Sequence, residues 1–278
     1  MSDATQNPEK SDLPTRFATA VLLTAVAGMA VYLSGWPFRM LAAAAACMML
    51  LEWSDMRRVG RIWTWLGIVL MVGGLIFASE LPFPAMANNL FDVNYDLLAP
   101  APQGLAIMAA LGLLLGLLSR RISLGWGFIY IGVPAYALIV VNWALWHLSL
   151  WILLVTWAAD IFAYFAGRTN GGPKLAPRIS PKKTWAGLAG GMVGAAIVGA
   201  VAGQLLEIDP VFHYLGAPLG LLAVLGDLYE SAVKRRCGVK DSGTILPGHG
   251  GILDRLDGLL PVALATFAVL VGLATGHL

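Results

Sequence analysis

The chain has 278 residues, of which 58% are hydrophobic and only 12% are charged, and its formal net charge is +2. Soluble domains carry about 25% charged residues and about 45–50% apolar residues. This chain has too few polar side chains to cover a water-soluble globule of its size, so the lipid bilayer is its expected solvent. The small net charge gives no reason to expect nucleic acid as a partner. The two cysteines form no CxxC metal or redox motif.

Nine apolar segments approach the length of a spanning helix, which needs about 20 mostly apolar residues. They are residues 17–34, 38–53, 62–79, 104–119, 126–146, 148–166, 185–205, 211–227 and 256–276. The second is the weakest because Glu52 ends it early, and the fifth and sixth require a tight turn at Trp146, His147 and Leu148. We divide the chain into a polar cytoplasmic tail without signal-peptide features (1–16), N-terminal membrane helices (17–150) and a C-terminal catalytic region (151–278).

The cations test this count, because Lys and Arg near membrane spans collect on the cytoplasmic side. The tail and the connections after the second, fourth, sixth and eighth segments hold 17 of the 18 Lys and Arg residues, and only Arg39 falls on the other side. The sequence therefore predicts an all-α, polytopic bundle of about nine transmembrane helices. Its N-terminus is expected in the cytoplasm, and its expected location is the inner (cytoplasmic) membrane of a cell. The outer connection 80–103 is expected to be irregular or partly re-entrant.

Carboxylates inside apolar segments indicate function, because one Asp at a helix centre costs about 2.5–3.5 kcal/mol. Asp160 and Asp227 are such residues, although either could instead mark a helix end in the headgroup region. The densest group of polar residues follows in 226–257, with five carboxylates, five cations and a Pro-Gly-His-Gly-Gly turn. Asp254 and Asp257 are spaced i, i+3, so on a helix they share a face and, with Asp227, could bind Mg²⁺ through oxygen.

A second basic segment, residues 167–185, contains Gly, Pro and Ser that interrupt a helix. It could be an ordinary cytoplasmic loop that orients the chain. The alternative is a flap that carries Ser180, Lys182, Lys183 and Thr184 toward substrate phosphates bound at the carboxylates and cations of residues 226–257.

The run from Ser231 to Asp257 reads SAVKRRCGVKDSGTILPGHGGILDRLD. It resembles the signature of the phosphatidate cytidylyltransferase (CDP-diacylglycerol synthase) family: Ser-x-x-Lys-Arg, four residues, Lys-Asp-x-Gly, then Pro-Gly-His-Gly-Gly-x-x-Asp-Arg-x-Asp. Residues 160–167, Lys174 and 179–185 are similar to a second family region. The family often has Glu or Gln where this chain has Ala186, so we give position 186 no catalytic role. The resemblance covers roughly the C-terminal half.

The resemblance implies a membrane enzyme that transfers CMP from CTP to phosphatidate and releases pyrophosphate. The expected cofactor is Mg²⁺, with a second cation left open, and the expected partners are CTP, phosphatidate and membrane lipids, with a homodimer left open. The residues expected at the transfer are Lys234, Arg235, Lys240, Asp241, His249 and Arg255. The expected substrate contacts are Ser180, Lys182, Lys183, Thr184, Ser231, Gly248, Gly250 and Gly251. The expected metal ligands are Asp227, Asp254, Asp257 and Asp160.

Three other classes use similar residues. CDP-alcohol phosphotransferases also have membrane-surface aspartates, but their motif begins Asp-Gly and spaces its last two aspartates four apart. A CTP-dependent lipid kinase is nearer in chemistry. A transporter could also contain intramembrane carboxylates, but no paired, Gly- or Pro-broken helices in two corresponding halves support it.

Overall fold

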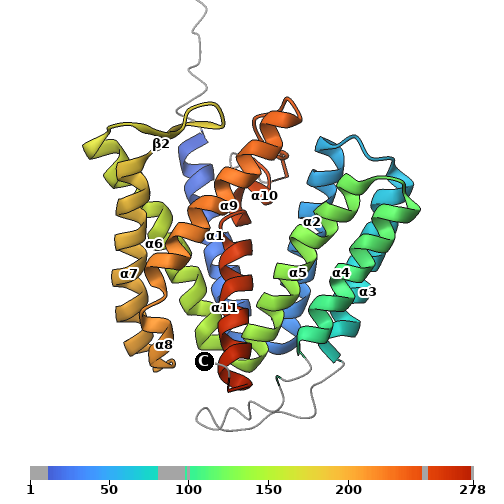
Figure 1. The fold of residues 1–278 in the computed structure, drawn as a ribbon, viewed down its shortest axis with the longest axis horizontal. Helices are drawn as coiled ribbons and strands as arrows, with labels where there is room; N and C mark the ends of the chain where they lie inside the picture. Colours follow the sequence, from blue (N-terminus) through green and yellow to red (C-terminus); the bar gives the residue numbers. More distant parts are fainter. Residues whose placement is uncertain (1–11, 81–97, 99–100, 246–249, 277–278) are drawn as a thin grey trace, which may run out of the picture.

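The computed structural model describes residues 12–80, 98, 101–245 and 250–276. Its long helices run alternately up and down in one bundle (Figure 1). The helices of the N-terminal half are α1 (Asp12–Leu33), α2 (Gly35–Met56), α3 (Arg61–Glu80), α4 (Ala101–Leu118) and α5 (Ile122–Ala144). The following elements are α6 (Trp146–Asn170), β1 (Lys174–Ala176), β2 (Ser180–Thr184), α7 (Trp185–Leu205), α8 (Pro210–His213), α9 (Gly216–Arg236), α10 (Leu253–Leu256) and α11 (Leu259–Ala274).

Each predicted apolar segment overlaps one of the long helices, although the segment 211–227 begins in the short helix α8 and covers only the first half of α9. In the described part of the chain, α3, α4, α5, α6 and α7 are long and apolar enough to cross a membrane by length and composition. The break between α5 and α6 is tighter than predicted, because it falls on Leu145 alone and α6 already begins at Trp146. Most of the outer connection 80–103, predicted to be irregular or partly re-entrant, lies outside the described residues.

Two features differ from the prediction of an all-α chain with a loop after residue 227. The basic segment between α6 and α7 forms a two-stranded antiparallel hairpin, in which Lys174 pairs with Thr184 and Ala176 with Ser180. The helix α9 does not end at residue 227 but continues to Arg236. It can continue because the charged side chains of its last turns lie at the end of the bundle, where they find partners or solvent.

The connections that carry cations gather at one end of the bundle. The turns from α2 to α3 and from α4 to α5, the hairpin, and the segment between α9 and α10 all lie at the top in Figure 1. The chain end after α11 lies at the opposite end. Arg39, the one cation predicted on the other side, forms an ion pair with Glu80. The arrangement of the helices thus agrees with the alternation from which the topology was predicted.

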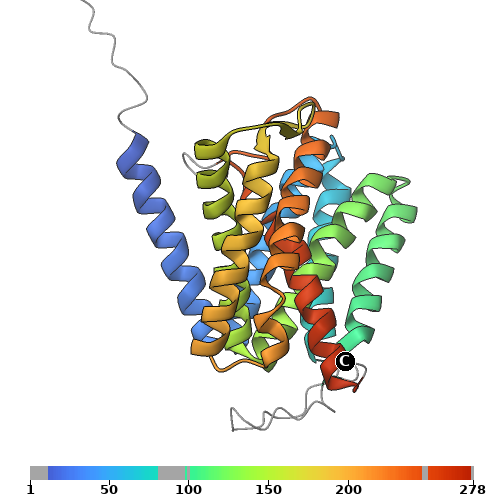
Figure 2. The same ribbon diagram turned by 60° about the vertical axis from the view of Figure 1, so that its left-hand side comes forward.

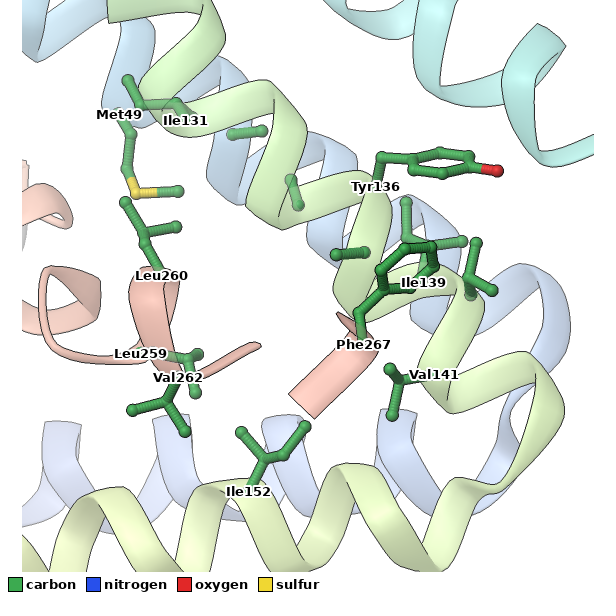
Figure 3. Packing of buried hydrophobic residues seen from close by; sticks show 14 of the residues in the cluster. Met49, Ile131, Tyr136, Ile139, Val141, Ile152, Leu259, Leu260, Val262 and Phe267 are labelled. Carbon is green, nitrogen blue, oxygen red and sulfur yellow. The ribbon is translucent and has the colours of Figure 1, made fainter. Parts of the chain in front are cut away.

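The helix α5 lies at the centre of the bundle, with buried residues on all its faces. Figure 3 shows its Ile131 near Met49 of α2, and its Tyr136 and Ile139 near Phe267 of α11. Glycines bring α4 and α5 together, because a Cβ at Gly125 would lie 2.5 Å from the carbonyl oxygen of Gly112. Such close backbone contact is typical of helices that pack in lipid.

The helix α1 stands apart from the other helices along much of its length (Figure 2). Its described side chains Leu22, Met29 and Tyr32 are exposed. Exposed apolar side chains of this size suit contact with lipid rather than water. In contrast to α1, the hairpin and the ends of α9 and α10 belong to the compact part of the bundle.

Candidate active site

The helix α9 places its polar residues in one stripe. Asp227, Glu230, Ser231 and Lys234 are spaced three or four residues apart, so they lie on the same helical face. The helix approaches the start of α11 closely, since a Cβ at Gly226 would lie 2.5 Å from the carbonyl oxygen of Asp257. This approach brings the stripe next to the aspartates that follow the glycine-rich turn.

The hairpin supplies a lysine to the N-terminal end of this stripe. Lys183 Nζ lies 2.6 Å from Asp227 Oδ2, and the two side chains are 22% and 34% exposed. The Ser231 hydroxyl donates to Asp227 Oδ1 at 3.2 Å. We call Lys183 and Asp227 the hairpin pair. It joins two segments that are far apart in the sequence, and its remaining exposure leaves it open to solvent or a ligand.

A second group is more deeply buried. Lys234 Nζ lies 2.5 Å from Glu230 Oε2 and 2.5 Å from Asp254 Oδ1, and the three side chains are 11%, 0% and 11% exposed. We call these residues the buried triad. With both carboxylates ionised, one lysine between them would leave a formal charge of −1 in a buried place, and burial raises the pKa of Glu230 to about 8. Such an arrangement is costly unless further donors compensate the charge.

Backbone donors compensate Asp254. Its Oδ2 accepts from the backbone N–H of Ser242 at 2.9 Å and of Gly251 at 3.0 Å. Burial raises the pKa of the Asp254 carboxyl, but the bond from Lys234 and these two amides outweigh it and hold the pKa below its usual range. Asp254 is therefore ionised at neutral pH, and both of its oxygens have partners.

Further carboxylates extend the group. Asp257 is buried, and its Oδ1 accepts from the backbone N–H of Gly258 at 2.8 Å. Asp257 interacts electrostatically with Asp227 and Glu230. Asp160 of α6 has an exposed side chain and interacts electrostatically with Asp227. The region thus contains several carboxylates that repel one another.

The remaining predicted residues lie in varied surroundings. Lys182 is exposed, since adjacent residues of a strand point to opposite faces and its neighbour Lys183 faces the site. Thr184 is buried and caps α7 by accepting from the backbone N–H of Gly187 at 3.0 Å. Arg235 is exposed and donates to the carbonyl oxygen of Val239 at 3.1 Å. The structure thus gives Thr184 a structural role and leaves Lys182 on the outer face of the hairpin.

The other predicted positions lie in the segment between α9 and α10, in α10 itself and in β2. Lys240, Asp241 and Arg255 are exposed, and Ser180 in β2 is half-buried. Gly250 has a φ of +82°, a conformation that favours glycine, while the N–H of Gly251 is already used by Asp254. His249 and Gly248, which we expect at the site, lie outside the described residues.

One residue of the site was not predicted. Glu52 of α2, considered from the sequence only as the end of an apolar segment, is buried and accepts hydrogen bonds from Ser242, Ile252 and Leu253. The signal that could have found it is a carboxylate in an apolar segment, which is the signal that singled out Asp160. The site therefore receives a residue from the N-terminal half, where no motif was recognised.

The carboxylates of this region suit a hard divalent cation, although Asp227 and Asp254 each contact a lysine in this structure. In the described part of the chain, no three His, Cys, Asp or Glu side chains converge in an arrangement that could hold a metal ion as they stand. Mg²⁺ prefers a few carboxylates with water and substrate phosphate. The mutual repulsion of Asp227 and Asp257 is what a bound cation would relieve.

Comparison with known proteins identifies the family of the chain. A model of the cytidylyltransferase family matches residues 14–273. A phosphatidate cytidylyltransferase of Brucella abortus is 32% identical over 271 residues, which cover 91% of each chain. The enzymes of the same name from Rickettsia bellii and Thermotoga maritima are 38% and 42% identical over 51% and 45% of this chain, and 67% and 50% of their own. The chain belongs to the cytidylyltransferase family.

Proposed function

We propose that this protein transfers CMP from CTP to phosphatidate, which yields CDP-diacylglycerol and pyrophosphate. The observation that carries the proposal is the cluster of lysines and carboxylates at one end of an apolar bundle. Lys183, Lys234 and Asp254 of this cluster lie in the segments that resemble the family, and Asp227 and Glu230 directly precede the second of them. The names of the similar proteins support the same reaction. A site of this kind suits two phosphate-bearing substrates, one of them a lipid.

The reaction needs no strong general base, because the phosphatidate phosphate is already an anion. One of its oxygens forms a bond to the α-phosphorus of CTP, and the bond from that phosphorus to the β-phosphate oxygen breaks, so pyrophosphate leaves with the electron pair. The main obstacle is repulsion between two polyanions, which positive charges reduce. Lys183 and Lys234 are positioned to contribute these charges, and Arg235, Lys240 and Arg255 are proposed to bind phosphates from the exposed side.

Mg²⁺ is proposed as the cofactor, with Asp227, Asp254 and Asp257 as its ligands and Asp160 nearby. When bound, it would supply charge that stabilises the phosphates and the leaving group. Asp227 and Asp254 each hold a lysine in this structure. Binding of a cation by Asp227 would therefore release the ammonium group of Lys183, which could then bind substrate phosphate, whereas Lys234 would keep its contact with Glu230.

The discriminating experiment supplies the purified protein with phosphatidate and CTP labelled at either the α- or the γ-phosphate. A cytidylyltransferase incorporates the α-label into lipid and releases the γ-label as pyrophosphate. A lipid kinase would instead move the γ-label into lipid, and a transporter would move neither. Absence of the α-label from lipid, with both substrates and Mg²⁺ present, would contradict the proposal.

The proposed membrane topology is nine spans in the inner membrane, with the N-terminus and the site on the cytoplasmic side. The cation distribution supports it, as does the gathering of the cation-bearing connections at one end (Figure 1). A reporter that is active only in the cytoplasm should be silent when fused to the C-terminus after Leu278. A strong signal from an intact fusion would contradict the odd number of spans.

A further inference from the structure

Glu52 links the N-terminal half of the chain to the site. Its Oε2 accepts from the hydroxyl of Ser242 at 3.0 Å and from the backbone N–H of Leu253 at 2.9 Å. Its Oε1 accepts from the backbone N–H of Ile252 at 2.9 Å. The side chain is almost fully buried, and all three of these donors are uncharged groups. A carboxylate buried in this way holds its donors firmly, because each of them would otherwise lose a charge-assisted hydrogen bond.

The donors belong to two segments that flank the glycine-rich turn. Ser242 precedes the turn, Gly251 is its last residue, and Ile252 and Leu253 follow it. We call these four residues the neck of the turn. One carboxylate thus bonds both sides of the neck and holds them next to each other.

Two glycines make room for the Glu52 carboxylate. A Cβ at Gly251 would lie 2.6 Å from Glu52 Oε2 and 1.9 Å from Ser242 Oγ. A Cβ at Gly243 would lie 2.7 Å from Glu52 Oε1. Larger residues at these positions would displace the carboxylate, so part of the glycine content of this segment is explained by Glu52 rather than by a ligand.

The end of α2 that carries Glu52 is itself fixed to the centre of the bundle. The adjacent Trp53 is fully buried, and its Nε1 donates to the carbonyl oxygen of Ser123 at 2.8 Å. Gly127 of α5 leaves space for the indole, because a Cβ there would lie 2.2 Å from its Nε1. Glu52 therefore extends from a rigid part of the structure.

The neck also connects directly to the buried triad. The backbone N–H groups of Ser242 and Gly251 donate to Asp254, whose other oxygen contacts Lys234. Ser242 consequently bonds both carboxylates, Asp254 through its backbone and Glu52 through its hydroxyl. A displacement of the neck would move the donors that orient Asp254.

We propose that Glu52 is a positioning residue for CMP transfer, which fixes the neck so that the Asp254 carboxylate keeps its orientation beside Lys234. It acts through the neck and need not touch either substrate. The inference rests on the proposed function for its kinetic test, but the placement of the neck can be measured without turnover.

The test compares Glu52→Gln with Asp55→Asn. Gln keeps the size of the side chain, but its NH₂ group would face a donor of the neck instead of accepting from it. Asp55 lies on the same helix, is exposed and pairs only at 3.4 Å with Arg61, so its substitution is the matched control. For Glu52→Gln we expect kcat/KM to fall about 100-fold, as when reacting groups are misplaced by about 1 Å. The Mg²⁺ concentration for half-maximal rate should rise, and hydrogen exchange of residues 242–253 should become faster.

Ser242→Ala provides a second variant, which removes only the hydroxyl bond to Glu52 and should cost about 10-fold in kcat/KM. If Glu52 acts through the neck, combining the two substitutions should cost less than the product of their separate effects. Rates are taken per folded molecule after size exclusion. If Glu52→Gln does not fold, Ser242→Ala decides the proposal alone, and unchanged kinetics and exchange in that variant would overturn it.

Wild-type kcat, KM and Mg²⁺ dependence in folded Glu52→Gln would also overturn it and would leave Glu52 a residue that only stabilises the fold. The proposed function fails separately, if the wild-type protein incorporates no α-label into lipid. In that case the exchange measurement still decides whether Glu52 holds the neck.

Discussion

The hairpin pair and the buried triad lie at the same end of the bundle and use the same residue types, but their surroundings differ. In the hairpin pair, both side chains keep part of their exposure, so solvent screens the attraction between Lys183 and Asp227. In the buried triad, Glu230 is fully buried and shares Lys234 with Asp254. The difference indicates that the hairpin pair can exchange its partners for a ligand, whereas the triad mainly keeps its geometry.

The largest effect is expected from removal of the metal. With EDTA present, turnover should fall to background, because the repulsion between the two substrates is then no longer reduced. Added Mg²⁺ should restore turnover. Mg²⁺ should also raise the Tm of the wild-type protein, since a ligand at about 100 times its Kd stabilises by about 2.7 kcal/mol. The Tm of Asp227→Asn should respond less. An equal response of both proteins would show that Asp227 does not bind the metal.

Substitution of the two aspartates separates the groups. Asp227→Asn and Asp254→Asn should each reduce turnover by orders of magnitude, and the double variant should be scarcely worse, because groups that act as a unit are not additive. Only Asp254→Asn should also lower the Tm clearly, since Lys234 then keeps Glu230 alone.

Asp209→Asn, which changes a helix cap at the opposite end of the bundle, serves as the control for this pair and should remain active. If Asp227→Asn or Asp254→Asn kept more than about a tenth of wild-type turnover, a loss below about 1.4 kcal/mol, that residue would not be a principal ligand.

Substitution of Lys234 and of Lys183 compares how much the buried triad and the hairpin pair stabilise the protein. Lys234→Met leaves Glu230 and Asp254 buried without their cation, which typically costs about 3–5 kcal/mol. Lys183→Met breaks a partly exposed pair, for which about 1 kcal/mol or less is expected. Thermal unfolding in detergent should therefore show a large decrease in Tm for Lys234→Met and a small one for Lys183→Met. Similar decreases for both variants would remove the distinction between the two groups.

The smallest effects are expected on kcat/KM after substitution of the hairpin lysines. We predicted from the sequence that Lys182 and Lys183 both act on substrate, but only Lys183 faces Asp227. Lys183→Ala should therefore reduce kcat/KM about 10- to 100-fold, as loss of a charge-assisted contact does. Lys182→Ala should change it less than about threefold. If Lys182→Ala and Lys183→Ala lost kcat/KM equally, at limiting CTP and at limiting phosphatidate, both lysines would act on substrate as the sequence predicted.

The helices could be predicted from the sequence, because apolar segments of spanning length and the distribution of cations depend on local composition. The same holds for the chemistry of residues 226–257, where carboxylates, cations and glycines are adjacent in the sequence. The extension of α9 to Arg236 was not predicted, since its charged last turns resemble a loop until Lys234 is seen between two carboxylates.

The sequence by itself determined that this is a mostly helical chain with apolar helices long enough to cross a membrane, and it predicted a phosphate-directed site near the C-terminus. Only the tertiary structure decided which charges meet: Lys183 with Asp227, Lys234 with Glu230 and Asp254, and Glu52 with the neck. Glu52 and Ile252 are 200 positions apart, so no local pattern relates them. Their contact arises because α2 is packed against α5 and its end thereby reaches the segment before α10, and such packing depends on the shapes of many side chains at once.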